Sequence, residues 1–297
     1  MNLTRRITSM PMLVLDRNVI RRTGLADAAA DAANEFVLTD TFLVEMVKHP
    51  ELWATTFRRD FAELRQIRDR FRISMSVGEC LRKEISEGRS INREELLPPE
   101  FQPSIARLLD LSTSNLDLPG VVLRAIADIL PDLRAEQAPQ SVPKESAVDL
   151  TRKLAARLRP EILSDLRNGS LHGDAMLCLV QDAACRAYEA YCADNHQTML
   201  PQPQSMTWRY FVLRVFRAMS WLQRGGLDTA TPGKLHNDAY DDEYVLLGSF
   251  FDGVLSAETR VNEAEAALRR IVESASSDDL LVAYTEYNAE RRGAPAA

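Results

Sequence analysis

The sequence predicts an α/β fold built on a parallel sheet, and three observations support this class. The first fifty residues alternate between short apolar runs and helical stretches, in the order strand, helix, strand, helix. Glycine supplies only 12 of the 297 residues and aromatic residues only 7%, which argues against an all-β sandwich or barrel. A hydrophobic content of 45% is enough to fill the core of one large domain or two ordinary ones.

The expected strands are short apolar runs, and the first ends in an acid. Residues 12–16 read Met-Leu-Val-Leu-Asp, a pattern typical of a buried parallel strand that presents a side chain at its carboxyl end. A helix over residues 18–34 should follow, because this stretch is rich in alanine and lacks proline. Further strands are expected at residues 36–38, 72–76 and 253–256.

Helices are expected to follow the second strand and to close the chain. Thr39 and Asp40 supply N-cap chemistry for a helix that continues to residue 47. A long helix over residues 51–71 should lead into the third strand, and an amphipathic helix is expected over residues 259–274.

The middle of the chain is expected to be a large helical insertion. Residues 91–230 contain no convincing strand, and prolines separate their helical stretches. Helices are expected at residues 101–111, 119–130, 144–167, 171–193 and 204–224. The domain prediction is therefore an α/β core of residues 1–90 and 231–297, interrupted by a helical subdomain of residues 91–230.

Composition limits the classes of function. A net charge of -7 excludes a generally basic coat, so a nucleic acid would have to bind a local patch. No apolar run approaches the ~20 residues that cross a bilayer, so we expect a cytoplasmic protein without membrane insertion. Cys178, Cys185 and Cys192 recur every seven residues in one expected helix, where neighbours lie ~10 Å apart. That distance is too long for a disulfide, so we expect a reduced stripe of cysteines.

Four acids occupy positions that a parallel sheet would gather. Asp16 ends a strand, Glu45 lies in the second helix, Asp241 begins a late helix and Glu258 follows a late strand. Ligands of open α/β sheets bind beyond the carboxyl ends of the strands. Converging carboxylates repel one another unless a cation lies between them, and oxygen ligands suit Mg²⁺ or Mn²⁺. Such a metal can activate water and neutralise charge on a phosphate, so hydrolysis of a phosphodiester is the expected reaction.

These residues resemble the motifs of PIN-like nucleases. Leu13-Val-Leu-Asp16-Arg-Asn18 is similar to the first strand and Asp-x-Asn of that family, and Glu45 is similar to its second acid. Asn237-Asp238-Ala-Tyr-Asp241 and Ser256-Ala-Glu258 resemble the third and fourth acidic positions. The resemblance covers about residues 10–90 and 235–275.

If the resemblance holds, it implies a three-layer α/β/α fold with a parallel sheet and a metal-dependent nuclease that acts on RNA more often than on DNA. It implies Asp16, Glu45, Asp241 and Glu258 as metal ligands and Asp238 as an auxiliary or alternative ligand. Asn18 and Ser256 would orient ligands or the attacking water. The helical middle has no counterpart in the minimal family fold, and Glu258 stands where the family usually has Asp.

Each of these acids also has a structural interpretation. Asp16 could bond only to backbone amides of the next helix, and Glu45 could face the surface. Asp40 fits an N-cap better than a ligand. Asp238 and Asp241 crowd a helix start expected at His236, where acids favour the helix dipole in any case. Asp252 is expected in a turn.

An arginine row is the expected contact for nucleic acid. Arg58, Arg65 and Arg72 recur every seven residues in and just after the helix expected over residues 51–71, with Arg68 beside them, so they should share one face. Such a face could contact phosphates, although neighbouring acids also allow a solvated, salt-bridged surface. These acids are Asp60, Glu63 and Asp69. The alternative to a nuclease is a non-catalytic protein that binds a protein partner, or itself, through the helical insertion.

Overall fold

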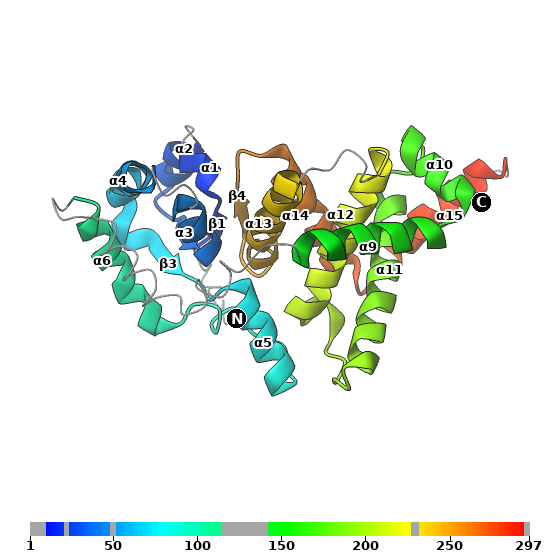
Figure 1. The fold of residues 1–297 in the computed structure, drawn as a ribbon, viewed down its shortest axis with the longest axis horizontal. Coiled ribbons are helices and arrows are strands. Elements are labelled where there is room, and N and C mark those ends of the chain that lie inside the picture. Colours follow the sequence, from blue (N-terminus) through cyan, green and yellow to red (C-terminus); the bar gives the residue numbers. More distant parts are fainter. Residues whose placement is uncertain (1–9, 21–23, 48–51, 114–141, 227–231, 294–297) are drawn as a thin grey trace, which may run out of the picture. The chain divides into compact units, whose positions relative to one another are not determined.

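The computed structural model describes residues 10–20, 24–47, 52–113, 142–226 and 232–293 (Figure 1). The chain forms two compact units, and each is assembled from segments that are distant in the sequence. The first unit comprises Met1–Ser76, Arg93–Arg134 and Leu247–Thr259. The second comprises Val77–Asn92, Ala135–Leu246 and Arg260–Ala297.

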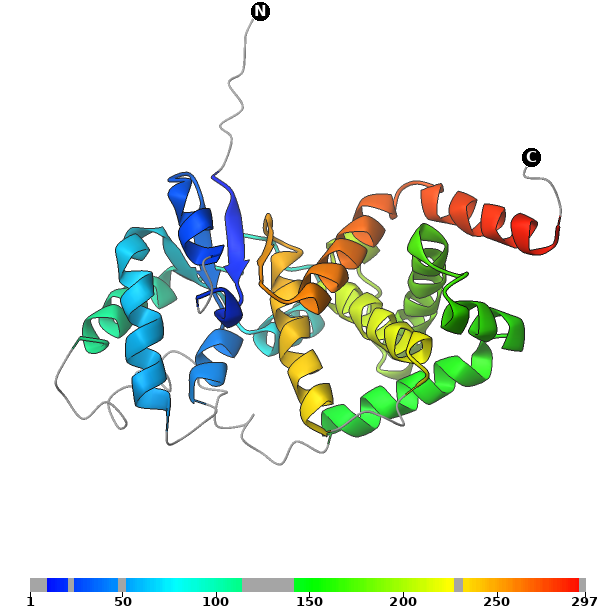
Figure 2. The ribbon, with the colours of Figure 1, turned by 90° about the horizontal axis from the view of Figure 1, so that it is seen from above.

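The first unit contains a parallel sheet of four strands. They are β1 (Met12–Leu15), β2 (Glu35–Leu38), β3 (Phe71–Ile73) and β4 (Gly253–Leu255). The spatial order is β3-β2-β1-β4, and every neighbouring pair runs parallel (Figures 1 and 2). The predicted α/β class and parallel sheet are confirmed. The third strand begins one residue before the expected position.

Short helices surround these strands in the first unit. They are α1 (Arg17–Ile20), α2 (Gly24–Ala30), α3 (Asp40–Val47), α4 (Trp53–Leu64) and α6 (Gln102–Leu111), with a 3₁₀ turn at Pro99–Phe101. Thr39 caps α3, because its Oγ1 accepts the amide hydrogen of Phe42 at 3.2 Å, whereas Asp40 is the first residue of that helix. The phenylalanines Phe36, Phe42 and Phe61 are completely buried.

The side chain of Gln102 covers the outer edge of β3. Its Oε1 accepts the amide hydrogen of Ile73 at 3.1 Å, and its Nε2 donates to the carbonyl of Ile73 at 3.2 Å. These two bonds replace those that a further strand would make, so the exposed sheet edge is protected. They also explain why the segment that contains α6 belongs to the first unit.

The prediction of one long helix over residues 51–71 is wrong after Leu64. The α-helix α4 ends at Leu64 and continues as the 3₁₀ helix η1 (Arg65–Arg70), in which Ile67 has non-helical angles (φ -127°, ψ 31°). Arg70 donates to the carbonyl oxygens of Asp31 at 2.6 Å and Ala29 at 2.7 Å. Phe71 is buried beside Phe36. These tertiary contacts outweigh the local helix propensity and start β3 early.

In the described residues of the second unit, the regular elements are all helices. Its helices are α5 (Val77–Glu87), α9 (Val142–Arg157), α10 (Pro160–Asn168), α11 (Gly173–Asp194), α12 (Met206–Gln223), most of α13 (Pro232–Gly248), most of α14 (Thr259–Ser274) and α15 (Asp279–Arg291), with a 3₁₀ turn at Gln202–Gln204. The helices expected at residues 101–111, 171–193, 204–224 and 259–274 are confirmed. The helix expected at residues 119–130 lies outside the described residues.

Prolines set two helix boundaries that differ from the prediction. The helix expected over residues 144–167 is split, because Pro160 begins α10 and restricts Arg159 to an extended conformation (φ -60°, ψ 143°). Pro232 begins α13 four residues before the expected start at His236. Asp238 and Asp241 therefore lie inside this helix rather than at its beginning.

The unit boundaries also differ from the expected limits of residues 91 and 230. Near residue 91, α5 belongs to the helical unit and α6 to the sheet unit, and beyond residue 230 only Leu247–Thr259 belongs to the sheet unit, so most of α13 and α14 and all of α15 belong to the helical one. Cys178, Cys185 and Cys192 all lie on α11 as expected and form no disulfide. Among the described helices, none combines the length and hydrophobicity needed to cross a bilayer.

Candidate functional site at the carboxyl ends of β1 and β4

The register of the sheet brings Asp16 and Ser256 together. Leu15 of β1 is paired with Leu255 of β4, so the residues that follow each strand lie opposite one another. The amide of Asp16 donates to the carbonyl of Leu255 at 3.0 Å and continues the ladder by one bond. Ser256 Oγ donates to Asp16 Oδ2 at 2.5 Å. Two segments that are 240 residues apart in sequence thus meet at one edge of the sheet.

Asn18 and Glu258 complete a closed ring of hydrogen bonds with these two residues. Asn18 Nδ2 donates to Glu258 Oε1 at 2.5 Å, and the amide of Glu258 donates to Ser256 Oγ at 3.0 Å. The amide of Asn18 donates to Asp16 Oδ1 at 3.0 Å. We call these four residues the Asp16 ring. The sequence predicted all four as site residues, and the structure brings them together.

Asp16 has the structural role that the sequence left open as an alternative to metal binding. Its Oδ1 accepts the amide hydrogen of the second residue of α1, which is the bond of a helix N-cap. Its Oδ2 faces Ser256 in the ring, and the side chain is almost fully buried, with 1% of the residue exposed. The two carboxyl groups of the ring are linked only through neutral donors, an amide and a hydroxyl.

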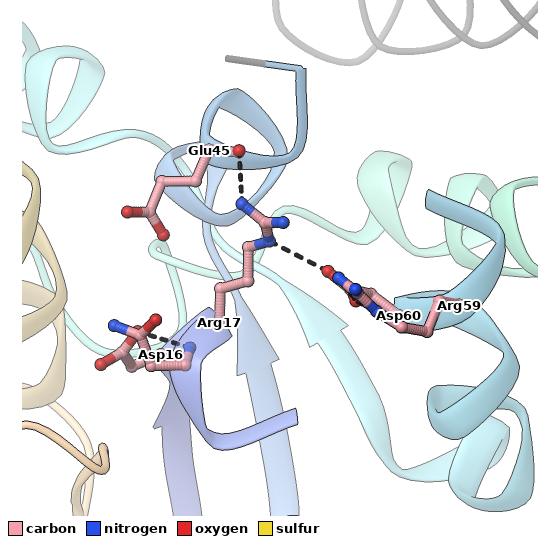
Figure 3. A network of polar contacts seen from close by, with 6 residues as sticks. Asp16, Arg17, Glu45, Arg59 and Asp60 are labelled. Atoms are coloured by element: carbon pink, nitrogen blue, oxygen red, sulfur yellow. Dashed lines mark hydrogen bonds and ion pairs between the residues drawn. The ribbon is translucent and has the colours of Figure 1, made fainter. Parts of the chain in front are cut away.

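Arg17 fixes the position of α3, which carries Glu45 (Figure 3). Its Nη1 donates to the carbonyl oxygen of Glu45 at 2.5 Å, and its Nε donates to Asp60 Oδ2 at 3.0 Å. Asp60 is fully buried and also accepts from Arg59 at 2.8 Å. The sequence treated Asp60 as a partner of the arginine row, whereas it is the buried anchor that holds α1, α3 and α4 together.

Glu45 is half-buried, so its side chain is neither fully exposed, as the surface alternative requires, nor enclosed in the core. Its backbone carbonyl is held by Arg17, whereas its carboxylate points away from that guanidinium (Figure 3). In this view the carboxylates of Glu45 and Asp16 both turn to the side opposite the pair formed by Arg17 and Asp60. Arg17 therefore holds the helix of Glu45 through its backbone carbonyl.

Asp238 and Asp241 belong to the second unit, on the same face of α13 as Asp242. All three are buried. Asp242 Oδ1 accepts a hydrogen bond from Arg217 Nε at 2.5 Å. Asp238 Oδ1 lies 3.6 Å from Arg260 Nη1 and forms an ion pair with it. The predicted helix start is wrong, so the helix dipole does not explain these acids, and arginines compensate two of them instead.

The three acids together determine the direction in which the pKa of Arg217 shifts. Burial alone would lower the pKa of this guanidinium, but the carboxylates of Asp242, Asp238 and Asp241 outweigh burial and raise it. Arg217, on α12, is therefore held as a cation inside the second unit. The spacing of 238, 241 and 242 at three and four residues was the sequence signal for one helix face.

The arginine row does not share one helix face. Arg58 lies on α4, Arg65 and Arg68 lie in η1, and Arg72 lies in β3. Arg72 donates to Glu35 of the neighbouring strand at 2.7 Å, which is a structural role. Arg58, Arg65 and Arg68 are exposed. Contact between these three residues and a nucleic acid remains a prediction.

Glu84 is a buried acid that the sequence prediction missed. It is 1% exposed and accepts bonds from Ser205 Oγ, Thr207 Oγ1 and the amides of Met206, Thr207 and Ile91, at 2.8–3.1 Å. It therefore caps the start of α12 and ties α5 to the second unit. The signal was its position on the buried face of α5 with Val77 and Cys80, at spacings of seven and four.

The carboxylate oxygens of the Asp16 ring are chemically suited to a hard divalent cation, which prefers oxygen ligands. The ring contains only two carboxylates, and within the described ranges no group of three or more His, Cys, Asp or Glu side chains is placed to hold a metal ion. No protein-family model matches the chain, and comparisons with curated proteins and with solved structures also give no match.

Proposed function

We propose that this chain is a Mg²⁺- or Mn²⁺-dependent nuclease of the PIN-like kind that hydrolyses phosphodiester bonds, with RNA preferred over DNA. The observation that carries the proposal is the Asp16 ring. Asp16, Asn18, Ser256 and Glu258 come from two distant motifs, and they meet at the carboxyl ends of adjacent parallel strands. This is the edge of the sheet at which open α/β folds bind their ligands.

Asp16 and Glu258 would hold the metal, with Glu45 as a further ligand from α3. A bound divalent cation would supply Lewis acidity and a more acidic water. The protein groups act around it: Asn18 orients the carboxylate of Glu258, Ser256 orients that of Asp16, and Arg17 holds α3 in place. Because both bridging donors are neutral, the ring leaves its negative charge available for a cation.

The proposal is tested by cleavage of mixed RNA and DNA oligonucleotides by the purified chain, with Mn²⁺ or with EDTA. We expect cleavage that requires the metal. Asp16→Asn and Glu258→Gln should lower the rate more than about 100-fold, since even partners of metal ligands contribute 10–100-fold. Glu63→Gln removes an exposed acid of the same unit from α4 and is the matched control, with unchanged activity.

Asp241→Asn tests the sequence-based assignment of Asp241 as a metal ligand separately. Loss of cleavage with an unchanged Mn²⁺-free melting temperature would support that assignment. Retained cleavage would leave Asp241 with only its electrostatic role beside Arg217. Absence of metal-dependent cleavage by the parent chain on every oligonucleotide would contradict the nuclease proposal.

A second candidate function is a non-catalytic PIN-like protein that binds a protein partner through its helical part. One observation favours it: both carboxylate oxygens of Asp16 already accept hydrogen bonds, from the α1 amide and from Ser256. An acid satisfied in this way needs no metal. The melting temperature with and without Mn²⁺ separates the candidates, because only a nuclease site predicts a Mn²⁺-induced rise that Asp16→Asn removes.

A further inference from the structure

The second unit contains a pocket that plays no part in the proposed nuclease site. It lies between α9, α11 and α12, where α9 crosses the other two helices (Figure 1), and its volume is about 280 Å³. Its walls are mainly apolar. Leu150 and Leu154 come from α9, Leu179 from α11, and Val215 and Met219 from α12.

The pocket is lined by cations as well as by apolar side chains. Lys153 and Arg157 of α9 and Arg186 of α11 line it, together with one acid, Asp182. Asp182 forms an ion pair with Arg186. Within the described part of the chain, the side chains of Lys153 and Arg157 have no hydrogen-bond or ion-pair partner. The lining therefore carries two exposed cations without a counter-charge, in a chain whose net charge is -7.

Lys153 and Arg157 are four residues apart on one helix, where like charges repel each other. An anion placed at the mouth of the pocket would relieve that repulsion and interact with both side chains. The apolar walls of the pocket would bury a hydrocarbon chain, which is favourable in proportion to its area. One ligand that combines an anionic head with an apolar chain would satisfy both parts of the pocket.

We propose that this pocket binds a single-chain anionic amphiphile, a carboxylate with a medium-length alkyl chain. The head contacts Lys153 and Arg157, and the chain lies against Leu154, Leu179 and Met219. The volume supports one chain, because about 280 Å³ lies just below the ~300–1,000 Å³ of typical ligand sites. The proposal is independent of the nuclease proposal, since every lining residue belongs to the second unit.

The test is isothermal titration of the purified full chain with decanoate, and with decanol and decylammonium as matched probes. We expect saturable 1:1 binding of decanoate, with a rise in melting temperature. Decanol should bind at least about tenfold more weakly, because it lacks the charge that the two cations attract. Decylammonium should not bind measurably.

Two variants and one control locate the binding. The double variant Lys153→Gln with Arg157→Gln should weaken decanoate binding about tenfold, and Ala183→Phe should fill the pocket and abolish binding. Arg152→Gln is the matched control, because Arg152 is exposed on the same helix, pairs with Asp149 and does not line the pocket. It should leave the affinity within twofold of the parent value.

Three results would overturn the proposal. One is the absence of saturable decanoate binding. Another is equal binding of all three probes, or an equal affinity in the double variant and the Arg152→Gln control. The third is a dimer of the parent chain, seen in sedimentation as mass increases with concentration, that Ala183→Phe disrupts and decanoate does not. That outcome would assign the pocket to a second copy of the chain.

Discussion

Two clusters of acids, one in each unit, are held in different ways. In the first unit, Asp16 and Glu258 are linked through the hydroxyl of Ser256 and the amide of Asn18, which are neutral donors. In the second unit, Asp242 is bonded to the guanidinium of Arg217. A neutral donor fixes the geometry of a carboxylate but leaves its charge, whereas a guanidinium removes the need for any other cation. The two clusters therefore differ in whether an arginine already compensates the carboxylates. Neutral donors alone do not mark a binding site, because Glu84 of the second unit is held by them in a structural role.

The largest effect should come from breaking an arginine pair of the second unit. Asp242→Asn removes the hydrogen-bonded member of the three carboxylates that act on Arg217, whose side chain is only 10% exposed. Breaking a buried ion pair costs about 3–5 kcal/mol, and Asp238 and Asp241 still compensate part of the remaining charge, so we expect a loss of about 3 kcal/mol in the free energy of unfolding, measured with urea at neutral pH. Asp149→Asn is the control, because its pair with Arg152 is exposed and should contribute less than about 0.5 kcal/mol.

Asp60→Asn extends this prediction to the first unit. Asp60 is a buried partner of Arg17, so it should behave like Asp242 rather than like Asp16. A loss below about 1 kcal/mol in either variant would show that the guanidinium pairs are not structural anchors, and the distinction between the two kinds of acid would fail.

A smaller effect should follow from changing the neutral donors of the Asp16 ring. Ser256→Ala removes the donor to Asp16 and the acceptor for the amide of Glu258. Hydrogen bonds to charged groups contribute about 1.5–3 kcal/mol and others about 1, so we expect a loss of about 2 kcal/mol in metal-free urea unfolding. If this residue supports a metal ligand, cleavage should also fall about 10–100-fold.

Ser86→Ala is the control for this variant. Ser86 is exposed on α5 and donates only to the carbonyl of Lys83, so its loss should change stability by less than about 0.5 kcal/mol. Unchanged stability together with unchanged cleavage in Ser256→Ala would mean that the ring neither supports the fold nor positions a catalytic group.

The sequence predicted the sheet and the Asp16 ring because both depend on local patterns. Short apolar runs mark the parallel strands, and the register of β1 and β4 then places the residues after each strand at one edge. Asp16, Asn18, Ser256 and Glu258 all lie within three residues of a strand end. Such positions follow from the chain itself once the strands are known.

The misplaced features depend on contacts that no local pattern contains. The arginine row required a helix as far as residue 71, but Arg70 and Phe71 are held by groups about 40 residues away in sequence. Sequence spacing predicts Asp60 as a solvated partner of the nearby arginines of α4 and η1. Its bond to Arg17 spans 43 residues, so that spacing does not reveal it. Propensity and spacing describe neighbours along the chain, so partners of this kind were outside their reach.

Asp165 is a third case, in which one acid is held by both kinds of donor. Tyr287 donates its hydroxyl to Asp165 Oδ2 at 2.5 Å, and Arg291 Nε donates to the same oxygen at 2.9 Å. The hydrogen bond from Tyr287 is the main cause that lowers the pKa of Asp165, and Arg291 lowers it further. At Asp165, the hydrogen bond from a neutral hydroxyl therefore lowers the pKa of the carboxyl group more than the hydrogen bond from the neighbouring guanidinium does.

The smallest predicted effect is the pH dependence of this contact. Burial, followed by the hydrogen bond to Asp165, raises the pKa of Tyr287 to about 12. Because the folded pKa exceeds the value of about 10 in the unfolded chain, the folded state keeps a proton that the unfolded state loses. The contribution of Tyr287 to stability is thus complete below pH 10 and is lost as the pH rises through about 12.

Absorbance titration at alkaline pH, with Tyr287→Phe as the reference, should show one tyrosine with this high pKa. In Asp165→Asn its pKa should move toward 10, since the carboxylate no longer opposes ionisation while burial still does. An unshifted pKa in that variant would assign the whole effect to burial and remove Asp165 from the comparison.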